Sequence, residues 1–274
     1  MAFADPHAVY QGSYTWRGAD WWFGGFSGIE LDPGGTQMTT VNDRGLVAVA
    51  TLIRDKGRVT GISDVSFRPL LNTFGFPLFE NNADAEGLAV HPSGRVFVSF
   101  ERHHRVLVYH DFNARARRVP DLPAEVVLQK NKSLEALALH PDGTLYTLPE
   151  RPTPSAGPFP LFTYNDGEWS VARTIPQSGP FLPVGADFDA QGRFYLLERA
   201  VTPLGFRSQV RRFDLAEPGT PAQVLFTTRA GVHDNLEGLA VWRDDHGADW
   251  LTLIADDNFL SLQRTELVDY LIKE

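Results

Sequence analysis

The sequence predicts an all-β protein, a β-propeller made of four-stranded blades around a central axis, and three observations carry this prediction. The stretch Glu-Gly-Leu-Ala-Val occurs at residues 86–90 and again at 237–241, with a looser copy at 135–139. The 24 glycines and 19 prolines recur along the whole chain, which is typical of short strands joined by tight turns. No segment shows a sustained helical period.

Aligning the chain on this stretch yields five copies of one unit. Each copy begins about 50 to 60 residues after the previous one, close to the length of a four-stranded propeller blade. The copies begin at Ser27-Gly28, Glu86-Gly87, Glu135-Ala136, Val184-Gly185 and Glu237-Gly238. In this alignment Gly28 and Gly185 stand where the other three copies have glutamate. We interpret the glycine after each glutamate as a residue needed for close packing at the axis.

Each copy reads as a first strand, a glycine-containing turn, a second strand that ends on an acid, and two further strands. Residues 95–100 and 106–109 illustrate the second and third strands, and 169–175 the more polar fourth strand. The glycine supplies the positive φ that a tight hairpin needs. The acids that end the second strands are Asp43, Glu101, Glu150, Glu198 and Asp257.

The fifth copy lacks a fourth strand, whereas an unused strand-like run precedes the first copy at residues 8–16. We expect this N-terminal run to complete the last blade and close the ring, because closure removes two open sheet edges. The copies predict five blades within one domain, residues 1–274. A sixth blade is the alternative if 57–83 or 115–131 contains another sheet.

Composition excludes several classes of protein. A formal net charge of −9 argues against nucleic acid as a partner, since phosphate backbones require a basic surface. The absence of cysteine excludes disulfides and thiolate-ligated zinc. No apolar run approaches the length of a membrane helix, so we expect no membrane span. We also expect the protein to be a monomer.

The first residues can be interpreted in two ways, one of which is the end of a signal peptide. Ala2-Phe3-Ala4 before Asp5 reads like the small-x-small end of a signal peptide. In this interpretation residues 1–7 are a remnant of that signal, and the protein is periplasmic or secreted. The alternative is a chance match.

Ionisable residues concentrate where the central channel opens. In a blade, residues before the first strand and after the second strand open on the same face. Carboxylates crowded there repel one another unless a cation neutralises them, and oxygen ligands suit Ca²⁺, or Mg²⁺ as an alternative. The predicted metal ligands are Glu86, Glu237, Asp43, Glu101, Glu135 and Asp257.

Four arginines follow acids at the ends of the second strands. Planar guanidinium donors suit a phosphate or carboxylate group, so we interpret Arg44, Arg102, Arg151 and Arg199 as substrate-binding residues. The alternative is that the acid–arginine doublets pair across neighbouring blades and fasten the ring. For proton transfer the candidates are His233 and His104, and we count Glu237 and Glu86 with them as catalytic candidates. His91 and His140 fall in hairpin turns on the far face.

With the repeat laid out, the chain resembles the phytase-like esterase family of bacterial secreted proteins. The stretches that carry the resemblance are Ser27-Gly28, Asn42-Asp43-Arg44-Gly45, Asp84-x-Glu86-Gly87, Asn131, Leu134-Glu135-Ala136-Leu137, Leu197-Glu198-Arg199, Asn235-x-Glu237-Gly238-Leu239, Asp256-Asp257-Asn258-Phe259, Gln263 and Thr265. The resemblance implies a β-propeller, export, and hydrolysis of phosphate or other esters assisted by calcium. The Asp-Asp-Pro-Ala calcium motifs of true phytases are absent, so the resemblance does not point to phytate.

Two hypotheses about function follow. The first is a Ca²⁺-assisted hydrolase acting on a phosphate ester, or another ester or lactone, at the central funnel, with a small anionic or ester substrate. The alternative is a non-enzymatic propeller that binds a ligand or protein through the same acidic and arginine-rich face, since fold alone does not decide function.

Overall fold

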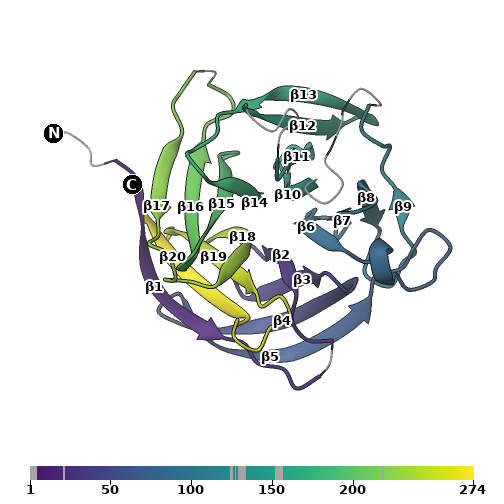
Figure 1. Cartoon of the computed structure of the whole chain (residues 1–274), viewed down its shortest axis with the longest axis horizontal. Coiled ribbons are helices and arrows are strands. Elements are labelled where there is room, and N and C mark those ends of the chain that lie inside the picture. The colour runs from purple at the N-terminus through teal and green to yellow at the C-terminus, as the bar shows by residue number, and fades with distance from the viewer. Residues whose placement is uncertain are drawn as a thin grey trace.

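The computed structural model describes residues 5–20, 22–123, 126, 128, 134–151, 157–217 and 219–274. Five four-stranded antiparallel sheets stand around one axis (Figure 1). This arrangement confirms the predicted five-bladed β-propeller. In the described part of the chain the one helical element is a 3₁₀ turn, η1 (Glu80–Asn82), and none of its helices is long and apolar enough to cross a membrane.

In blades one to four the strands follow one another along the chain from the axis outward. Blade one consists of β2 (Phe26–Leu31), β3 (Gln37–Asn42), β4 (Leu46–Asp55) and β5 (Arg58–Pro69). Blade two consists of β6 (Ala85–Val90), β7 (Val96–Phe100), β8 (Arg105–Tyr109) and β9 (Arg117–Arg118). Blade three consists of β10 (Leu134–Leu139), β11 (Leu145–Pro149), β12 (Phe159–Asn165) and β13 (Glu168–Ile175). Blade four consists of β14 (Leu182–Phe188), β15 (Phe194–Thr202), β16 (Gly205–Phe213) and β17 (Gln223–Thr227).

The fifth blade is shared between the two ends of the chain. It consists of β18 (Asn235–Arg243), β19 (Asp249–Asp256), β20 (Glu266–Lys273) and, outermost, β1 (His7–Thr15). β1 pairs antiparallel with β20 from His7 opposite Lys273 to Thr15 opposite Glu266. The predicted closure by the N-terminal strand is therefore confirmed. The described residues of 57–83 and 115–131 hold β5, η1 and β9 and no sixth sheet.

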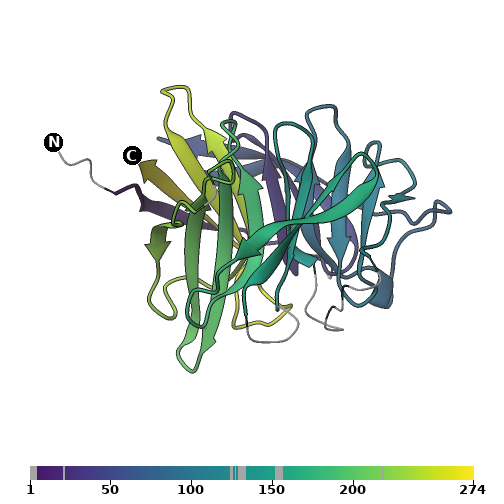
Figure 2. The same ribbon diagram turned by 90° about the horizontal axis from the view of Figure 1, so that it is seen from above.

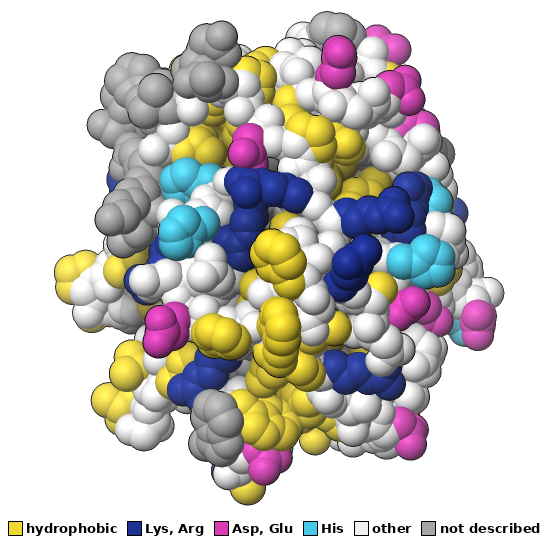
Figure 3. All heavy atoms as spheres, turned by 90° about the vertical axis from the view of Figure 1, so that its right-hand side faces the viewer, with side chains coloured by type: hydrophobic (Ala, Val, Ile, Leu, Met, Phe, Trp, Pro, Cys, Tyr) yellow, Lys and Arg dark blue, Asp and Glu magenta, His cyan; other side chains and the backbone are white. Residues whose placement is uncertain are grey.

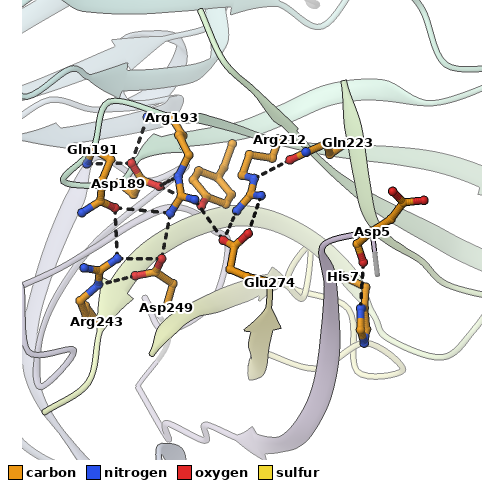
Figure 4. Close-up of polar contacts among 11 residues, drawn as sticks. Asp5, His7, Asp189, Gln191, Arg193, Arg212, Gln223, Arg243, Asp249 and Glu274 are labelled. Carbon is orange, nitrogen blue, oxygen red and sulfur yellow. Dashed lines mark hydrogen bonds and ion pairs between the residues drawn. The ribbon is translucent and has the colours of Figure 1, made fainter. Parts of the chain in front are cut away.

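The strands run through the thickness of the disc, so loops gather on its two faces (Figure 2). We call the face on which the innermost strands begin the mouth face. On the opposite face, the last residue links blade five to blade four (Figure 4): the Glu274 carboxylate accepts hydrogen bonds from Arg212 Nη1 at 2.6 Å and from Arg193 Nη1 at 3.0 Å. Arg193 also pairs with Asp189 and Asp249. The sequence reasoning did not foresee this network.

A β-bulge interrupts the innermost strand of every blade at the same place. The pairing shifts between Phe26 and Gly28, Ala85 and Leu88, Leu134 and Ala136, Pro183 and Gly185, and Leu236 and Gly238. A bulge leaves one residue outside the ladder and re-aims its side chain. These residues, which we call the bulge ring, are Ser27, Glu86, Glu135, Val184 and Glu237. Ser27 and Val184, rather than Gly28 and Gly185, therefore replace glutamate in blades one and four.

The glycine after the bulge lets neighbouring innermost strands approach closely. A Cβ on Gly87 would lie 2.5 Å from Leu137 Cβ, and one on Gly185 would lie 2.5 Å from the Glu237 carbonyl oxygen. The space left at the axis is about 10 Å³, room for about one water molecule. The channel is therefore nearly closed at its narrowest point, below the carboxylates of the mouth face. Apolar side chains packed between adjacent sheets, such as Leu88 with Val41, form the core.

Candidate functional site

The second strand of each blade places one residue beside the bulge ring. Asn42, Phe100, Pro149, Glu198 and Ala255 lie opposite the residue that precedes the bulge. The next residue in each blade therefore occupies an equivalent position, and we call these five the strand-end ring. They are Asp43, Glu101, Glu150, Arg199 and Asp256.

This strand pairing changes the positions that the sequence predicted for two acids, Glu198 and Asp257. Glu198 lies one residue too early and is buried inside blade four, where Arg211 Nε and Nη2 donate to it at 2.6 and 2.7 Å. Asp257 lies one residue too late. Its carboxylate accepts hydrogen bonds from the Gly25 and Phe259 N–H groups and the Thr265 hydroxyl, each at 3.0 Å. Asp257 thus fastens loops together, while Asp256 takes the position facing the channel.

Two groups of carboxylates could hold a metal ion, and both contain Glu86. Oxygens of Asp43, Asp84 and Glu86 lie within 4.8 Å of one another, and so do oxygens of Glu86, Glu101 and Glu135. Asp84 precedes the bulge of β6 by two residues. The structure thus brings together four predicted ligands from blades one, two and three, and adds Asp84.

Burial and mutual repulsion disfavour the charged forms of these carboxylates. Burial raises the pKa of Glu86 well above its usual value, and the neighbouring Glu135 and Asp43 carboxylates add to the effect. Burial and the Glu237 carboxylate raise the pKa of Asp43 to about 8 and that of Asp256 to about 9. Burial and Glu150 likewise raise the pKa of Glu135. A cation would relieve this repulsion.

Arg199 is the cationic member of the strand-end ring. Its Nη1 donates to Asn235 Oδ1 at 2.6 Å and to the Glu237 carboxylate, and its Nη2 lies 3.6 Å from Glu150 Oε1. Asn235 Nδ2 donates to the same Glu237 oxygen at 2.8 Å. Blade four therefore supplies a positive charge that links it to blades three and five. This matches the alternative in which an arginine pairs across neighbouring blades.

The other three predicted arginines lie in different surroundings. The Arg44 guanidinium stacks over the Phe259 ring at 3.7 Å. Arg102 is half-exposed and donates to Asp84 at 2.6 Å and to Asn81 at 2.9 Å. The Nε of Arg151 is buried and finds no hydrogen-bond partner among the described residues. Asn131, a further residue of the sequence-based site, lies outside the described residues.

Neither candidate histidine contacts a carboxylate of the two rings in the described part of the structure. His233 is buried beside Tyr10 and Tyr270, and its Nε2 lies 2.6 Å from the Tyr270 hydroxyl. Burial lowers its pKa to about 4, with a smaller effect from Arg264. His104 lines a small cavity of about 130 Å³ with Leu122 and Trp169, and its Nδ1 has no partner there. Both histidines therefore pack among aromatic and apolar side chains, away from the carboxylates of the two rings.

The sequence placed Asp84, Glu150 and Asp256 near the channel opening but not among the predicted ligands or catalytic residues, and the structure brings them into the site. The available signal was the spacing from each bulge residue, because the same residue of the second strand recurs beside it in all five blades. Two acids farther along the innermost strands have a different role. Glu30 accepts from the Val90 N–H at 3.2 Å, and Asp187 from the Val241 N–H at 2.6 Å. They satisfy edge N–H groups of the next blade.

The comparison with protein families bears directly on this site. A model for the phytase-like family, described as "esterase-like activity of phytase", matches residues 21–259. The chain belongs to the phytase-like family. This match spans both rings and confirms the resemblance inferred from the motifs. No curated protein sequence matches the chain at a significant level.

Several solved structures match this phytase-like chain at low sequence identity. The PQQ-bound aldose sugar dehydrogenase from Streptomyces coelicolor is 11% identical, with a TM-score of 0.50, and the match covers 97% of this chain and 100% of that one. A gluconolactonase from Xanthomonas campestris is 16% identical, with a TM-score of 0.47 and coverage of 89% and 72%. A protein of unknown function from Dyadobacter fermentans is 12% identical, with a TM-score of 0.48 and 98% coverage of both chains. At 11% identity, the similarity to the aldose sugar dehydrogenase indicates a shared fold and nothing about function.

The donor set itself indicates which cation would fit. The two groups around Glu86 offer carboxylate oxygens and no imidazole or thiolate. Hard cations such as Ca²⁺ take six to eight oxygen ligands, whereas zinc sites use nitrogen and sulfur. The residues present are therefore chemically suited to Ca²⁺ or Mg²⁺.

Proposed function

We propose that this phytase-like protein is a metal-assisted hydrolase that cleaves a phosphate ester, a carboxylic ester or a lactone at the mouth of its central channel. The observation that carries the proposal is the position of Glu86, shared by two carboxylate groups and facing a ring that contains Arg199. Family membership supports ester hydrolysis as the reaction class.

In this proposal five carboxylates hold the metal: Asp43, Asp84, Glu86, Glu101 and Glu135. Calcium is the ion that the donors favour, with Mg²⁺ as the alternative. When bound, such an ion polarises a phosphoryl or carbonyl oxygen. By holding the metal at a fixed place, the carboxylates would also set where the reacting ester lies relative to blade five.

Blade five supplies the proton-transfer groups in place of the histidines. Glu237 is positioned by Arg199 and Asn235, so its carboxylate can accept a proton from an attacking water molecule. Asp256, whose pKa of about 9 keeps it protonated at neutral pH, can donate a proton to the leaving oxygen. Two carboxyl groups in different environments thus divide the roles of base and acid. We propose that Arg102, half-exposed beside Asp84, and Arg44, stacked on Phe259, contact an anionic substrate at the rim.

Turnover assays on three substrate classes test the proposal. An aryl phosphate, an aryl ester and a lactone would be incubated with metal-stripped protein, with and without Ca²⁺ or Mg²⁺. We expect metal-dependent turnover of at least one class, abolished by Glu237→Gln. Glu168→Gln, on the exposed outer strand β13, is the matched control and should keep full activity. Absence of turnover with either metal on all three classes contradicts the proposal.

The second candidate is a propeller that binds a ligand or protein without cleaving it. In this candidate Arg199, which holds blades three, four and five together, keeps the mouth face rigid for binding. Calorimetric Ca²⁺ binding without turnover would support it. For either function we propose an exported protein, periplasmic or secreted, which family membership supports.

A further inference from the structure

The loop between β5 and η1 exposes three phenylalanines. Phe74, Phe76 and Phe79 are 81%, 64% and 65% exposed, whereas Leu70 and Leu78 at the base of the loop are buried. Large aromatic side chains at this exposure, gathered on one loop, mark an interaction surface rather than ordinary surface variation. The loop belongs to the crossing from blade one to blade two.

The loop is held in a defined shape by its own hydrogen bonds. Asn72 Oδ1 accepts from the N–H groups of Phe74 at 2.9 Å and Phe76 at 3.1 Å, and Asn72 N–H donates to the Phe76 carbonyl at 2.7 Å. The Leu78 N–H donates to the Leu70 carbonyl at 2.9 Å. Satisfied N–H groups lower the cost of placing a loop in an apolar medium. The phenylalanines are therefore presented on a preorganised tip.

Arginines surround this tip although the chain as a whole is acidic. Phe74 and Phe79 line a hollow of about 390 Å³ together with His103, Arg105 and Arg118. Arg68 reaches Asn113 at 2.7 Å, in the loop after β8. Figure 3 shows dark blue side chains on both sides of a central group of hydrophobic ones on this side of the molecule.

Two acids near the tip are paired with arginines, whereas Glu80 and Asp111 are exposed. Asp121 accepts from Arg118 at 2.7 Å, and Asp84 from Arg102 at 2.6 Å. Glu80 is the exposed acid of the adjoining turn. Exposed aromatic rings flanked by guanidinium groups complement a surface that is apolar below and anionic above. That combination describes the interface of a bilayer containing anionic lipids.

We propose that the 70–79 loop and its flanking arginines dock this protein reversibly on an anionic lipid bilayer. The three rings enter the level of the lipid headgroups and upper acyl chains, and the exposed Arg68 and Arg118 lie against the phosphates. Arg105 is buried and holds the base of the hollow through the His103 and Asn82 carbonyls. Three aromatic side chains with a few arginines give weak, salt-sensitive binding. The surface lies at the outer edge between blades one and two, and its role is independent of the reaction proposed for the channel.

Vesicle sedimentation of the full chain tests the proposal. Vesicles of phosphatidylcholine alone would be compared with vesicles that also contain phosphatidylglycerol, at low and high salt. We expect binding to the anionic vesicles that Phe74→Ser weakens about tenfold or more and that added salt and Arg68→Gln also reduce. Leu204→Ser is the matched control, because Leu204 is 82% exposed on blade four, and it should leave binding unchanged.

Several results would overturn the proposal. It is wrong if wild-type protein binds neither kind of vesicle, or if Phe74→Ser and Phe76→Ser bind as well as wild type. It is also wrong if light scattering shows self-association of the wild type that Phe74→Ser abolishes, because the loop would then be an interface between copies of the chain. Unchanged far-UV circular dichroism confirms that each variant is folded, since the substituted side chains are exposed.

Discussion

The Arg199 guanidinium on β15 donates a hydrogen bond to the Glu237 carboxylate on β18, and the two residues hold register positions that repeat in every blade. Arg199 occupies the strand-end position where the other blades have Asp43, Glu101, Glu150 and Asp256. Glu237 occupies the bulge position it shares with Glu86 and Glu135. The fivefold repeat therefore carries one charge reversal, in blade four, and the cation is enclosed by carboxylates.

This charge reversal divides the mouth face into two parts. On the side of blades one to three, the carboxylates of Asp43, Asp84, Glu86, Glu101 and Glu135 lie close together, and Arg102 pairs with Asp84. On the side of blades four and five, Arg199 and Asn235 engage Glu237. The proposed metal ion would lie on the first side, where the two carboxylate groups meet at Glu86.

Replacing Glu86 should abolish stabilisation by Ca²⁺. Saturating Ca²⁺, at about 100 times its dissociation constant, should stabilise the wild type by about 2.7 kcal/mol. Glu86→Gln replaces the carboxylate common to both groups with a neutral amide, so its melting temperature should no longer respond to Ca²⁺. Without metal, the variant should be at least as stable as wild type, because one repelling charge is gone. Differential scanning calorimetry measures both effects, and an unchanged Ca²⁺ response would contradict the assignment.

Removing the Arg199 charge should destabilise the metal-free protein by about 3 to 5 kcal/mol, the usual cost of breaking a buried ion pair from one side. Arg199→Met leaves Glu237 and Glu150 without their cation. The double variant Arg199→Met/Glu237→Gln should recover part of this loss. Urea unfolding measures both, and a single variant as stable as wild type would show that the pair contributes little.

Asp256 and Asp257 should respond differently to truncation. Asp257→Ala leaves the Gly25 and Phe259 N–H groups and the Thr265 hydroxyl without their acceptor, at a cost of about 1 to 3 kcal/mol. Asp256→Asn should change stability less but remove the proposed proton donor. Urea unfolding together with turnover assays separates the two. Full activity in Asp256→Asn would assign the proton transfer elsewhere.

Acid should destabilise the protein in part through His233. Its pKa is about 4 in the folded chain and about 6.5 when unfolded, so as pH falls below 6.5 the unfolded state gains a proton first. The stability is therefore fully present above pH 6.5 and lost as pH falls through 4, with a total of about 3 kcal/mol. His233→Gln should show a flatter pH dependence over this window. Parallel profiles for variant and wild type would rule this out.

Gly87 should not tolerate a side chain. A Cβ there would lie 2.5 Å from Leu137 Cβ and 2.8 Å from the Glu135 carbonyl oxygen, so Gly87→Ala should cost about 1 to 3 kcal/mol through overpacking. Gly34→Ala is the matched control: its Cβ would meet only Asp32 Oδ2, at 3.7 Å, and we expect little change. Thermal unfolding compares the stabilities of the two variants. Equal stabilities would mean that the innermost strands can move apart to accommodate the added Cβ, and would contradict the prediction.

The repeat made most of the architecture predictable. Glu86 and Glu237 followed by glycine, with a turn and an acid-ending strand after them, identified the innermost strands of the blades. The surplus strand at 8–16 predicted the closure with β20. Period-two alternation and turn residues are local signals, and a ring of identical units reuses them five times.

The sequence by itself determined the propeller and placed Glu86, Asp43, Glu101 and Glu135 around one opening, and it favoured five blades over six. The structure decided for five. Only the tertiary structure decided that Asp256 and not Asp257 faces the channel, that Glu198 turns inward to Arg211, and that His233 packs against Tyr270. The physical reason is the bulge. One residue inserted into a strand changes which side chain faces the axis. The sequence alone does not show which of two adjacent residues, such as Asp256 and Asp257, takes that position, because this depends on the pairing with the neighbouring strand.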